Sequence, residues 1–290
     1  MTHIPVLTKE VLQYLDPKEN ENFIDCTVGQ GGHTKLILEK NAPDGKVLGI
    51  DLDPDQINNC KSIIKDSRLI LVNDSYANIK EIVDVTKLGE VNGVLLDLGM
   101  SSWQLEGTNK GFSFQKDEEL DMRYNQAQTL TAKIIVNEYS KEEIEKILEE
   151  YGEEKFAKQI ARKITEERQV KKIESTLQLV EIIKRAMPTK FQYGKIHCAT
   201  RTFQALRIAV NDELNNLEKV LPIIISVLSS GGRAVIISFH SLEDRIVKNF
   251  LKNKEGVIKI LTKKPIIAED GEVKMNPRSR SAKLRAFIKI

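Results

Sequence analysis

The first hundred residues alternate short, uniformly apolar runs with amphipathic stretches, and this alternation constrains the fold more than any other feature. The apolar runs predict β-strands, and the segments between them predict helices. Because the runs are apolar along their whole length, each strand is expected to be covered on both faces, as in a parallel sheet. The predicted strands are 22–26, 46–52, 69–72 and 91–98, with helices at 34–40 and 54–65. The chain is therefore predicted to be an α/β protein.

This pattern stops after the fourth strand and later resumes. Helices alone are predicted in between, one of them opened by a capping box at Ser140 and Glu143. The alternation then returns with helices at 212–230 and 241–251 and strands at 233–239, 257–261 and 284–290. A helical block between the fourth and fifth strands of one sheet is an insertion, not a tandem domain. We expect an α/β domain formed by residues 1–112 and 210–290, and an inserted helical domain at 113–209.

The charge, the cysteines and the apolar runs of the sequence limit the partners and the cellular compartment that we expect. The 44 basic and 42 acidic residues give a formal charge of +2, which neither requires nor excludes a nucleic-acid partner. The cysteines at 26, 60 and 198 are few, distant and odd in number, so neither a disulfide framework nor a zinc site is expected. No run approaches the length of a membrane span. We expect a cytoplasmic protein that binds no metal.

A glycine-rich loop, DCTVGQGGHT at 25–34, directly follows the first strand. Its glycines let the backbone approach a ligand, and the next helix offers free N–H groups to an anion. Asp51 ends the second strand, where a carboxylate can accept both hydroxyls of a ribose. A dinucleotide loop would have glycine or alanine in place of Thr34. Asp25 also suits a cationic ligand better than a pyrophosphate. The loop favours S-adenosylmethionine, with a dinucleotide or a ligand-free turn as alternatives.

A second group of polar residues follows the fourth strand. In open parallel sheets, ligands bind beyond the carboxyl ends of the strands near the point where strand order reverses. Asp97 is therefore placed to meet the ammonium group of the donor or the amine of an acceptor, with a helix cap as the structural alternative. Gln104 is a candidate for contact with adenine or with the target base. Trp103 could stack on a base or could pack in the interior.

Arginines cluster in two places. Arg201 and Arg207 lie six residues apart in one predicted helix, and Arg278 and Arg280 belong to the acid-free segment 275–285. Arginine suits phosphate because it can form two parallel hydrogen bonds with it. We therefore expect these four side chains to contact RNA. The alternative is a solvated surface or pairing with acidic residues.

Eight segments in order along the chain carry a resemblance to a known family. They are HIPVL at 3–7, TVGQGGHT at 27–34, LLDLGMSS at 95–102, GFSF at 111–114, LDMR at 120–123, ATRTFQALRIAVNDEL at 199–214, SFHSLEDRIVK at 238–248 and NPRSRSAKLR at 276–285. With them the chain resembles the RsmH (MraW) family, bacterial methyltransferases of cytosine N4 in 16S ribosomal RNA. Because the segments span the whole chain and several are long, the resemblance is specific.

The resemblance implies a class I S-adenosylmethionine methyltransferase fold with a helical insertion that recognises the substrate. It also implies methylation of N4 of a cytidine in the decoding region of 16S rRNA, with the small ribosomal subunit as partner. The implied donor-binding residues are Gly31, Gly32, His33, Asp51, Tyr76, Asp97 and Gln104. Trp103 and Cys198 depart from the family, in which proline is common at both positions.

The exocyclic amine of cytosine is a poor nucleophile, so a residue that accepts its proton is expected. Asp97 is the first candidate, while His240 and Asn211 are candidates for catalysis or for contact with RNA. Three other functions stay open: a dinucleotide oxidoreductase, another base-amine methyltransferase including one acting on DNA, and a non-catalytic ribosome-assembly factor. A homodimer is also compatible with the sequence.

Overall fold

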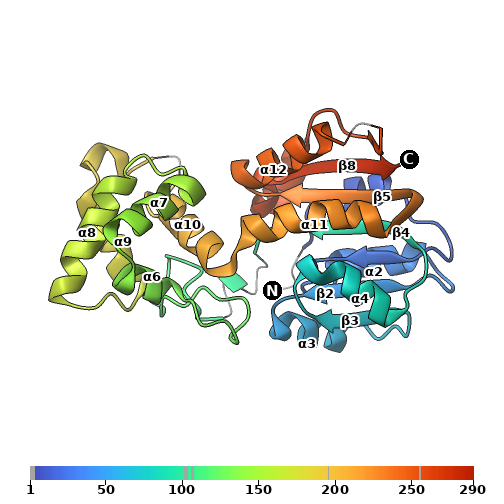
Figure 1. The fold of residues 1–290 in the computed structure, drawn as a ribbon, viewed down its shortest axis with the longest axis horizontal. Helices are drawn as coiled ribbons and strands as arrows, with labels where there is room; N and C mark the ends of the chain where they lie inside the picture. Colours follow the sequence, from blue (N-terminus) through green and yellow to red (C-terminus); the bar gives the residue numbers. More distant parts are fainter. Residues whose placement is uncertain (1–3, 101–103, 106–107, 195, 255) are drawn as a thin grey trace. The chain divides into compact units, whose positions relative to one another are not determined.

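The computed structural model describes residues 4–100, 104–105, 108–194, 196–254 and 256–290 and contains two compact units (Figure 1). The α/β unit comprises Met1–Gly99 and Leu214–Ile290, and the helical unit comprises Met100–Glu213. The helical unit is longer than the insertion expected at 113–209. It is longer because Phe112 lies in its hydrophobic core and the N–H of Met122 donates to the carbonyl of Lys110.

The α/β unit is built on one sheet with the strand order β3-β2-β1-β4-β5-β8-β6. The first five strands of this order are mutually parallel, whereas β8 is antiparallel to β5, to β6 and to the short β7. Strand order reverses at β1, which lies between β2 and β4, so the predicted switch point is present. The strands are β1 Phe23–Asp25, β2 Val47–Asp51, β3 Leu69–Asn73, β4 Val91–Asp97, β5 Leu228–Ser238, β6 Ile258–Ile260, β7 Ile266–Ile267 and β8 Lys283–Lys289.

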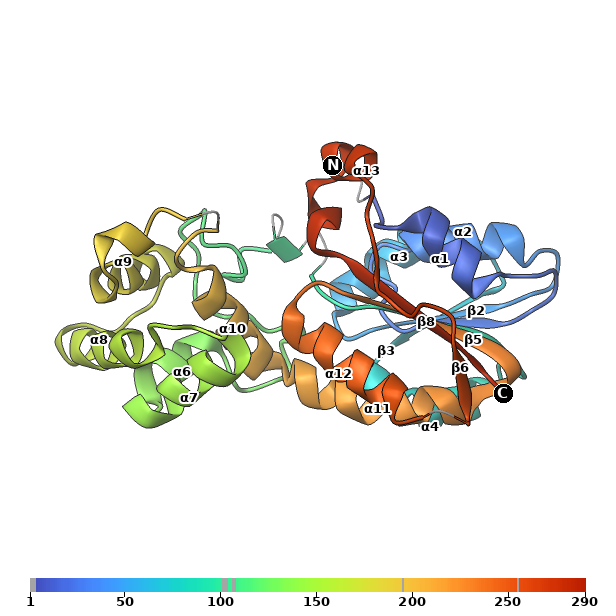
Figure 2. The ribbon, with the colours of Figure 1, turned by 90° about the horizontal axis from the view of Figure 1, so that it is seen from above.

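Helices cover both faces of this sheet (Figure 2). One face carries α1 Thr8–Leu15, α2 Gly32–Lys40 and α3 Pro54–Ile63, and the other carries α4 Ile79–Thr86, α11 Glu213–Val227 and α12 Ser241–Lys252. Successive side chains of a strand point to opposite faces. Accordingly, Leu95 of β4 packs in the core with α1 and α2, and Leu96 packs in the core with α4 and α11. This two-sided burial explains why the strands are apolar throughout.

The start of β5 differs from the sequence-based expectation. Residues 228–230 were expected to end a long helix, but they are strand, and Leu228 pairs with Val91 of β4. The register then shifts before Gly93 pairs with Arg233. A locally irregular strand can therefore continue where a helix end and a turn were predicted. The preceding helix α11 ends at Val227 and contains Pro222 in its interior.

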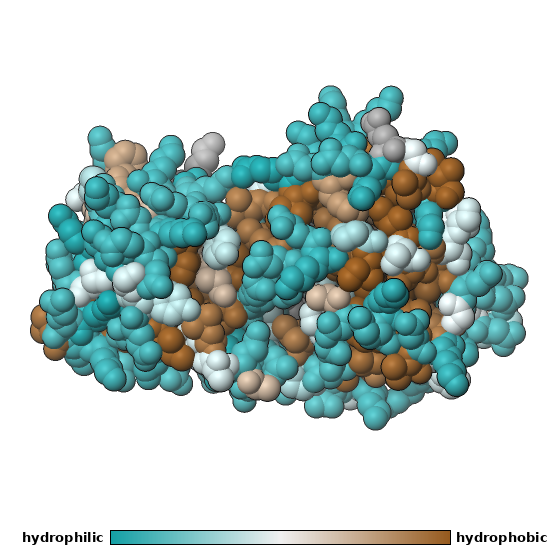
Figure 3. Space-filling model, in the orientation of Figure 1, coloured by the Kyte–Doolittle hydropathy of each residue, from teal (hydrophilic) through white to brown (hydrophobic). Residues whose placement is uncertain are grey.

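In its described residues the helical unit contains the helices α6 Ala132–Glu138, α7 Lys141–Gly152, α8 Ala157–Val170, α9 Thr176–Ala186 and α10 Thr200–Asn211. Their apolar faces form one core that includes Ile135, Leu148 and Leu206. Hydrophilic residues cover much of the unit in the view of Figure 3. The predicted capping box is confirmed, because Ser140 and Glu143 exchange side-chain to backbone hydrogen bonds at the start of α7. No helix in the described ranges has the length and apolar character to cross a membrane.

Candidate functional site

The glycine loop after β1 turns sharply into α2. Gly31 has φ 82° immediately before the helix, and a Cβ added there would lie 2.5 Å from Cδ1 of Ile64 and 2.9 Å from Sγ of Cys60. Only glycine fits this conformation and this close contact with the end of α3. Gly32 begins α2, whose first turn has no side-chain cap among the residues that the structure describes. Uncapped N–H groups at a helix start are suited to an anionic group of a ligand.

Asp25 holds this loop in place from inside the protein. Its side chain is 1% exposed; one carboxylate oxygen accepts from the Thr34 hydroxyl at 2.7 Å and the other from the N–H of Thr27 at 3.2 Å. Burial raises the pKa of the Asp25 carboxyl above its ordinary value. Asp25 therefore shapes the loop, whereas the sequence had suggested that it meets a cationic ligand. Thr27, which the sequence did not single out, accepts from the N–H of Asp97 at 2.8 Å and joins the loop to the end of β4.

Asp51 lies at the carboxyl end of β2. Its two carboxylate oxygens accept hydrogen bonds from the N–H groups of Gly29 and Asp53, both at 2.9 Å. These bonds set the orientation of the carboxylate and leave lone pairs for further donors. Burial, which outweighs the two hydrogen bonds, raises the pKa of Asp51 to about 7. Tyr76 follows β3 and begins a short 3₁₀ helix. It is partly buried and packs against the hydrophobic core that the sheet forms with α4 and α11.

Asp97 and His33 meet at the same edge of the sheet. Asp97 is the last residue of β4, and His33 lies in the first turn of α2 with 6% of its surface exposed. His33 Nε2 lies 3.5 Å from Oδ2 of Asp97. The other oxygen, Oδ1, and both ring nitrogens of His33 are buried without a hydrogen-bond partner in the described part of the chain. Leaving such atoms unpaired costs about 1–3 kcal/mol each, so the arrangement indicates a ligand with hydrogen-bond donors at this point.

The remaining residues expected near the donor belong to the helical unit. Gln104 is buried there with 7% of its surface exposed, and its backbone carbonyl accepts from the hydroxyl of Thr108 at 2.9 Å. Trp103 lies outside the described residues.

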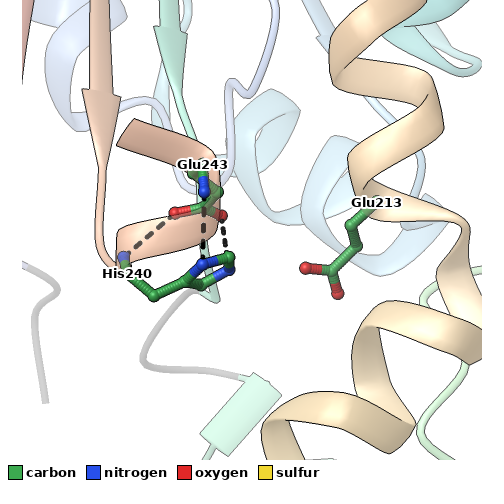
Figure 4. A group of neighbouring side chains, drawn as sticks. All are labelled: Glu213, His240 and Glu243. Carbon is green, nitrogen blue, oxygen red and sulfur yellow. Dashed lines mark hydrogen bonds and ion pairs between the residues drawn. The ribbon is translucent and has the colours of Figure 1, made fainter. Parts of the chain in front are cut away.

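His240 forms the start of α12 (Figure 4). Its Nδ1 accepts from the N–H of Glu243 at 3.4 Å, and Oε2 of Glu243 accepts from the N–H groups of His240 and Phe239 at 3.2 and 2.8 Å. The second ring nitrogen lies 3.2 Å from Oε1 of the same glutamate. These contacts form a capping box. Nε2 is nevertheless buried without a hydrogen-bond partner among the described residues, so catalysis or contact with RNA by His240 stays a prediction.

Two of the residues expected to contact RNA lie inside the helical unit. Arg207 is 8% exposed, and its guanidinium binds both carboxylate oxygens of Glu213 at 2.8 and 2.9 Å. Asn211 is 2% exposed; it donates to the carbonyls of Met122 and Arg207 and accepts from the N–H of Tyr124. Their polar atoms are engaged internally, so Arg207 and Asn211 have a packing role in this structure, and contact with RNA stays a prediction.

Arg201 remains at the surface of the helical unit. Its guanidinium donates to the carbonyl of Glu153 at 2.7 Å, on an exposed part of the unit. This contact uses one nitrogen and no carboxylate, so the expected phosphate contact remains open to Arg201.

The basic C-terminal segment combines exposed and buried arginines. Arg280 is exposed and Arg278 partly exposed in the 3₁₀ helix Pro277–Ser281, whereas Arg285 is 6% exposed and pairs with Asp244 at 2.7 Å. The same segment holds the start of the chain. The side chain of Asn276 donates to the carbonyl of Ile4 at 2.9 Å.

The helix α13, Asp270–Met275, adds a second tie to the start of the chain. A carboxylate oxygen of Glu272 accepts from the N–H of Leu7 at 2.8 Å. Between these two ties lies Pro5, whose ring packs closely against Gly32 of the glycine loop. The C-terminal segment therefore supports the glycine loop through the N-terminal residues, a tertiary arrangement that no local sequence signal indicated.

Comparison with known proteins places this geometry in a family. The model of the MraW methylase family matches residues 1–290. A relative from Sulfurihydrogenibium sp. is 47% identical over 99% of both chains, and one from Thermotoga neapolitana is 46% identical over 98% of this chain and 95% of its own. Both are named ribosomal RNA small subunit methyltransferase H.

Among solved structures, a Streptococcus mutans protein, described as a methyltransferase in complex with SAH, matches with a TM-score of 0.50. The two chains are 11% identical, and the match covers 99% of each, so this likeness concerns the fold alone. The predicted α/β architecture with a mostly parallel sheet is thereby confirmed as that of class I S-adenosylmethionine methyltransferases, and the chain belongs to the MraW methylase family.

Proposed function

We propose that this protein transfers a methyl group from S-adenosylmethionine to the RNA of the small ribosomal subunit, at N4 of a cytidine in the decoding region of 16S rRNA. The names of the relatives support the coarser part, methylation of small-subunit rRNA. The resemblance of the sequence motifs supports the finer part. The observation that carries the chemistry is the buried Asp97–His33 pair, whose unpartnered polar atoms lie where a parallel sheet binds its ligands.

The residues of the α/β unit fit the methyl donor. Asp51 can accept hydrogen bonds from both ribose hydroxyls, and the ring of Tyr76 offers a surface for the adenine. The uncapped start of α2 at Gly31 and Gly32 suits the carboxylate of the methionine part. The bound donor supplies an activated methyl group on a sulfonium. Asp97 and Gln104, two further residues that the resemblance implies for the donor, stay predictions.

Asp97 is also the proposed catalytic residue. The lone pair of N4 is conjugated with the cytosine ring, so the amine becomes nucleophilic only as it loses a proton. A carboxylate oxygen that accepts an N4–H bond favours this loss and takes the proton when the N4–methyl bond forms. Oδ2 of Asp97 lies toward His33, so Oδ1 is the oxygen that we propose for the N4–H group. His33 thus positions the carboxylate, and the target base leaves its stack to reach it.

One experiment tests the proposed function directly. The protein is incubated with labelled S-adenosylmethionine and 30S subunits that lack the modification, and the RNA is digested to nucleosides. We expect label in N4-methylcytidine from one position in the decoding region. Label in another nucleoside would contradict the N4 assignment and favour another base-amine methyltransferase. Binding of the donor without any transfer, to subunits or to free rRNA, would favour an assembly factor and contradict the enzymatic proposal.

A further inference from the structure

One stretch of the helical unit contains no acidic residue. Residues 182–211 include no aspartate or glutamate, although 42 such residues are spread over the 290 of the chain. Among its cations, Lys184 pairs with Glu181 at 2.7 Å and Arg185 pairs with Glu167 at 3.2 Å. Lys190 and Arg201 have no carboxylate partner within the described ranges. These two positive charges are therefore available to an anionic partner.

Aromatic and aliphatic side chains beside these cations are exposed to solvent. Tyr193 is 84% exposed, and Phe191 and Ile196 are each about half exposed. Single exposed apolar residues are common on protein surfaces. Here three lie within six residues, next to a lysine whose ammonium lies 5.1 Å from the centre of the Phe191 ring, so exposed apolar and basic side chains share one short stretch of the chain. Such a surface suits a ligand that has both flat rings and negative charge.

The backbone that carries these rings is fastened on both sides. Tyr193 forms an antiparallel bridge with His197, and the ring of His197 stacks on Phe114 at 4.6 Å between centroids. On the other side, the Gln192 side chain donates to the carbonyl of Lys184 at 2.8 Å. The Tyr193 ring is thus presented from a fixed base. Less ordering is then needed when a partner binds.

Internal contacts also connect Phe191 with Arg201. The ring of Phe191 packs against Phe156 at 5.0 Å, and the turn just before Phe156 contains Glu153, whose carbonyl accepts from the guanidinium of Arg201. The rings and the unpaired cations therefore belong to one region of the helical unit. We call Lys190, Phe191, Tyr193 and Arg201 the aromatic turn surface.

We propose that the aromatic turn surface binds single-stranded RNA, with unstacked bases on the rings of Tyr193 and Phe191 and phosphates on Lys190 and Arg201. This proposal rests on the proposed function, because the strand would be the rRNA that carries the target cytidine. Proteins commonly recognise RNA through splayed bases that stack on aromatic side chains, with cations along the backbone. A second copy of the chain would place two positive surfaces against each other, which disfavours self-association there.

Binding of a labelled single-stranded RNA of about 20 nucleotides from the decoding region, measured by fluorescence anisotropy at several salt concentrations, tests the proposal. Tyr193→Ala should weaken binding about 10-fold, the effect of losing one stacked base. Tyr193→Phe should restore it. Lys190→Ala should lower the slope of log affinity against log salt by about 0.7, the value for one phosphate of a single strand. The controls Val170→Ala and Lys172→Ala, at exposed positions of the same unit, should change neither quantity.

Methyl transfer to 30S subunits separates this proposal from the proposed function. Tyr193→Ala should raise KM for the subunits and leave kcat and the binding of SAH unchanged, because stacking away from the reacting atoms contributes equally before and during the reaction. Unchanged RNA affinity and unchanged KM in an active Tyr193→Ala variant would overturn the RNA surface while the proposed function stands. A change in the oligomeric state, or in binding to phosphatidylserine vesicles, with unchanged RNA affinity would also overturn it.

Discussion

Two groups of buried polar side chains, one in each unit, differ in whether they are paired. In the helical unit, Asn211 makes three hydrogen bonds to backbone groups, and Arg207 binds both oxygens of Glu213. In the α/β unit, Oδ1 of Asp97 and both ring nitrogens of His33 are buried without partners among the described residues. Native proteins rarely leave such groups unpaired. The paired side chains, Asn211 and Arg207, stabilise the fold, whereas the unpaired atoms of Asp97 and His33 are suited to bind a ligand.

The comparison also shows where each unit meets its surroundings. The α/β unit gathers polar side chains from β1, β2 and β4 at one edge of the sheet, so its chemistry lies in a partly buried site. The helical unit pairs its buried charges internally, so its contacts with RNA are expected at the surface, on Arg201 and on the aromatic turn surface. If this is right, substitutions at the edge of the sheet should change methyl transfer or donor binding, and substitutions of the internal ion pair of the helical unit should change its stability.

The largest effect is expected from Asp97→Asn. The substitution keeps the shape of the side chain but removes the proton acceptor, and we expect kcat for methyl transfer to fall by about 10²–10⁴-fold. Transfer to unmodified 30S subunits is the measurement. Asp84→Asn, on the exposed side of α4, is the matched control and should retain full activity. A near wild-type rate for Asp97→Asn would remove the catalytic role from this residue.

Arg207→Met tests whether the internal ion pair with Glu213 stabilises the helical unit. Without the guanidinium, the carboxylate of Glu213, whose side chain is 12% exposed, is left uncompensated. We expect the free energy of unfolding of the helical unit to fall by about 3–5 kcal/mol, measured by urea denaturation. The double substitution Arg207→Met with Glu213→Leu should regain most of this loss. If stability is unchanged and only affinity for RNA falls, Arg207 is a contact residue after all.

A pair of glycine substitutions compares two positions of the same loop. Gly31→Ala introduces a Cβ that overlaps Ile64 and Cys60, whereas Gly29→Ala, at φ 50°, meets nothing closer than 3.9 Å. Gly31→Ala should displace the loop and weaken binding of SAH by at least about 10-fold. Gly29→Ala should cost only the left-handed backbone conformation, about 1–2 kcal/mol. Calorimetric titration with SAH measures the affinity and urea denaturation measures the stability, and an equal loss of SAH affinity in the two variants would contradict the packing argument.

The smallest effect concerns pH. Asp51, with a pKa of about 7, is protonated below that value and ionised above it. The ionised carboxylate accepts from two ribose hydroxyls, so affinity for a neutral adenosyl ligand should rise several-fold between about pH 6 and pH 8. The probe is 5′-methylthioadenosine, which has the ribose and adenine but no amino acid group. Asp51→Asn should bind more weakly with a flat pH profile, and a sloping profile in this variant would assign the titration to another group.

Local patterns in the sequence predicted most of the architecture. Uniformly apolar strands and amphipathic helices repeat with periods that depend only on neighbouring residues, so the parallel sheet, the helical insertion and the capping box at Ser140 were predictable. The glycine loop and the carboxylates at the ends of β2 and β4 were also predictable, because parallel strands end at a common edge. The irregular start of β5 was not, since its pairing with Val91 overrides the local helical tendency.

By itself, the sequence determined the order of the elements and the polar residues that reach the edge of the sheet, because both follow from short-range periodicity. Only the tertiary structure decided which of these residues have partners. Asp25 accepts a hydrogen bond from Thr34 inside the protein, whereas Oδ1 of Asp97, beside His33, has no partner in the described part of the chain. In the same way, only the tertiary structure pairs Arg207 of the helical unit with Glu213. The reason is physical: whether a buried polar atom is satisfied depends on chain segments that packing brings together, and residue type alone does not specify them.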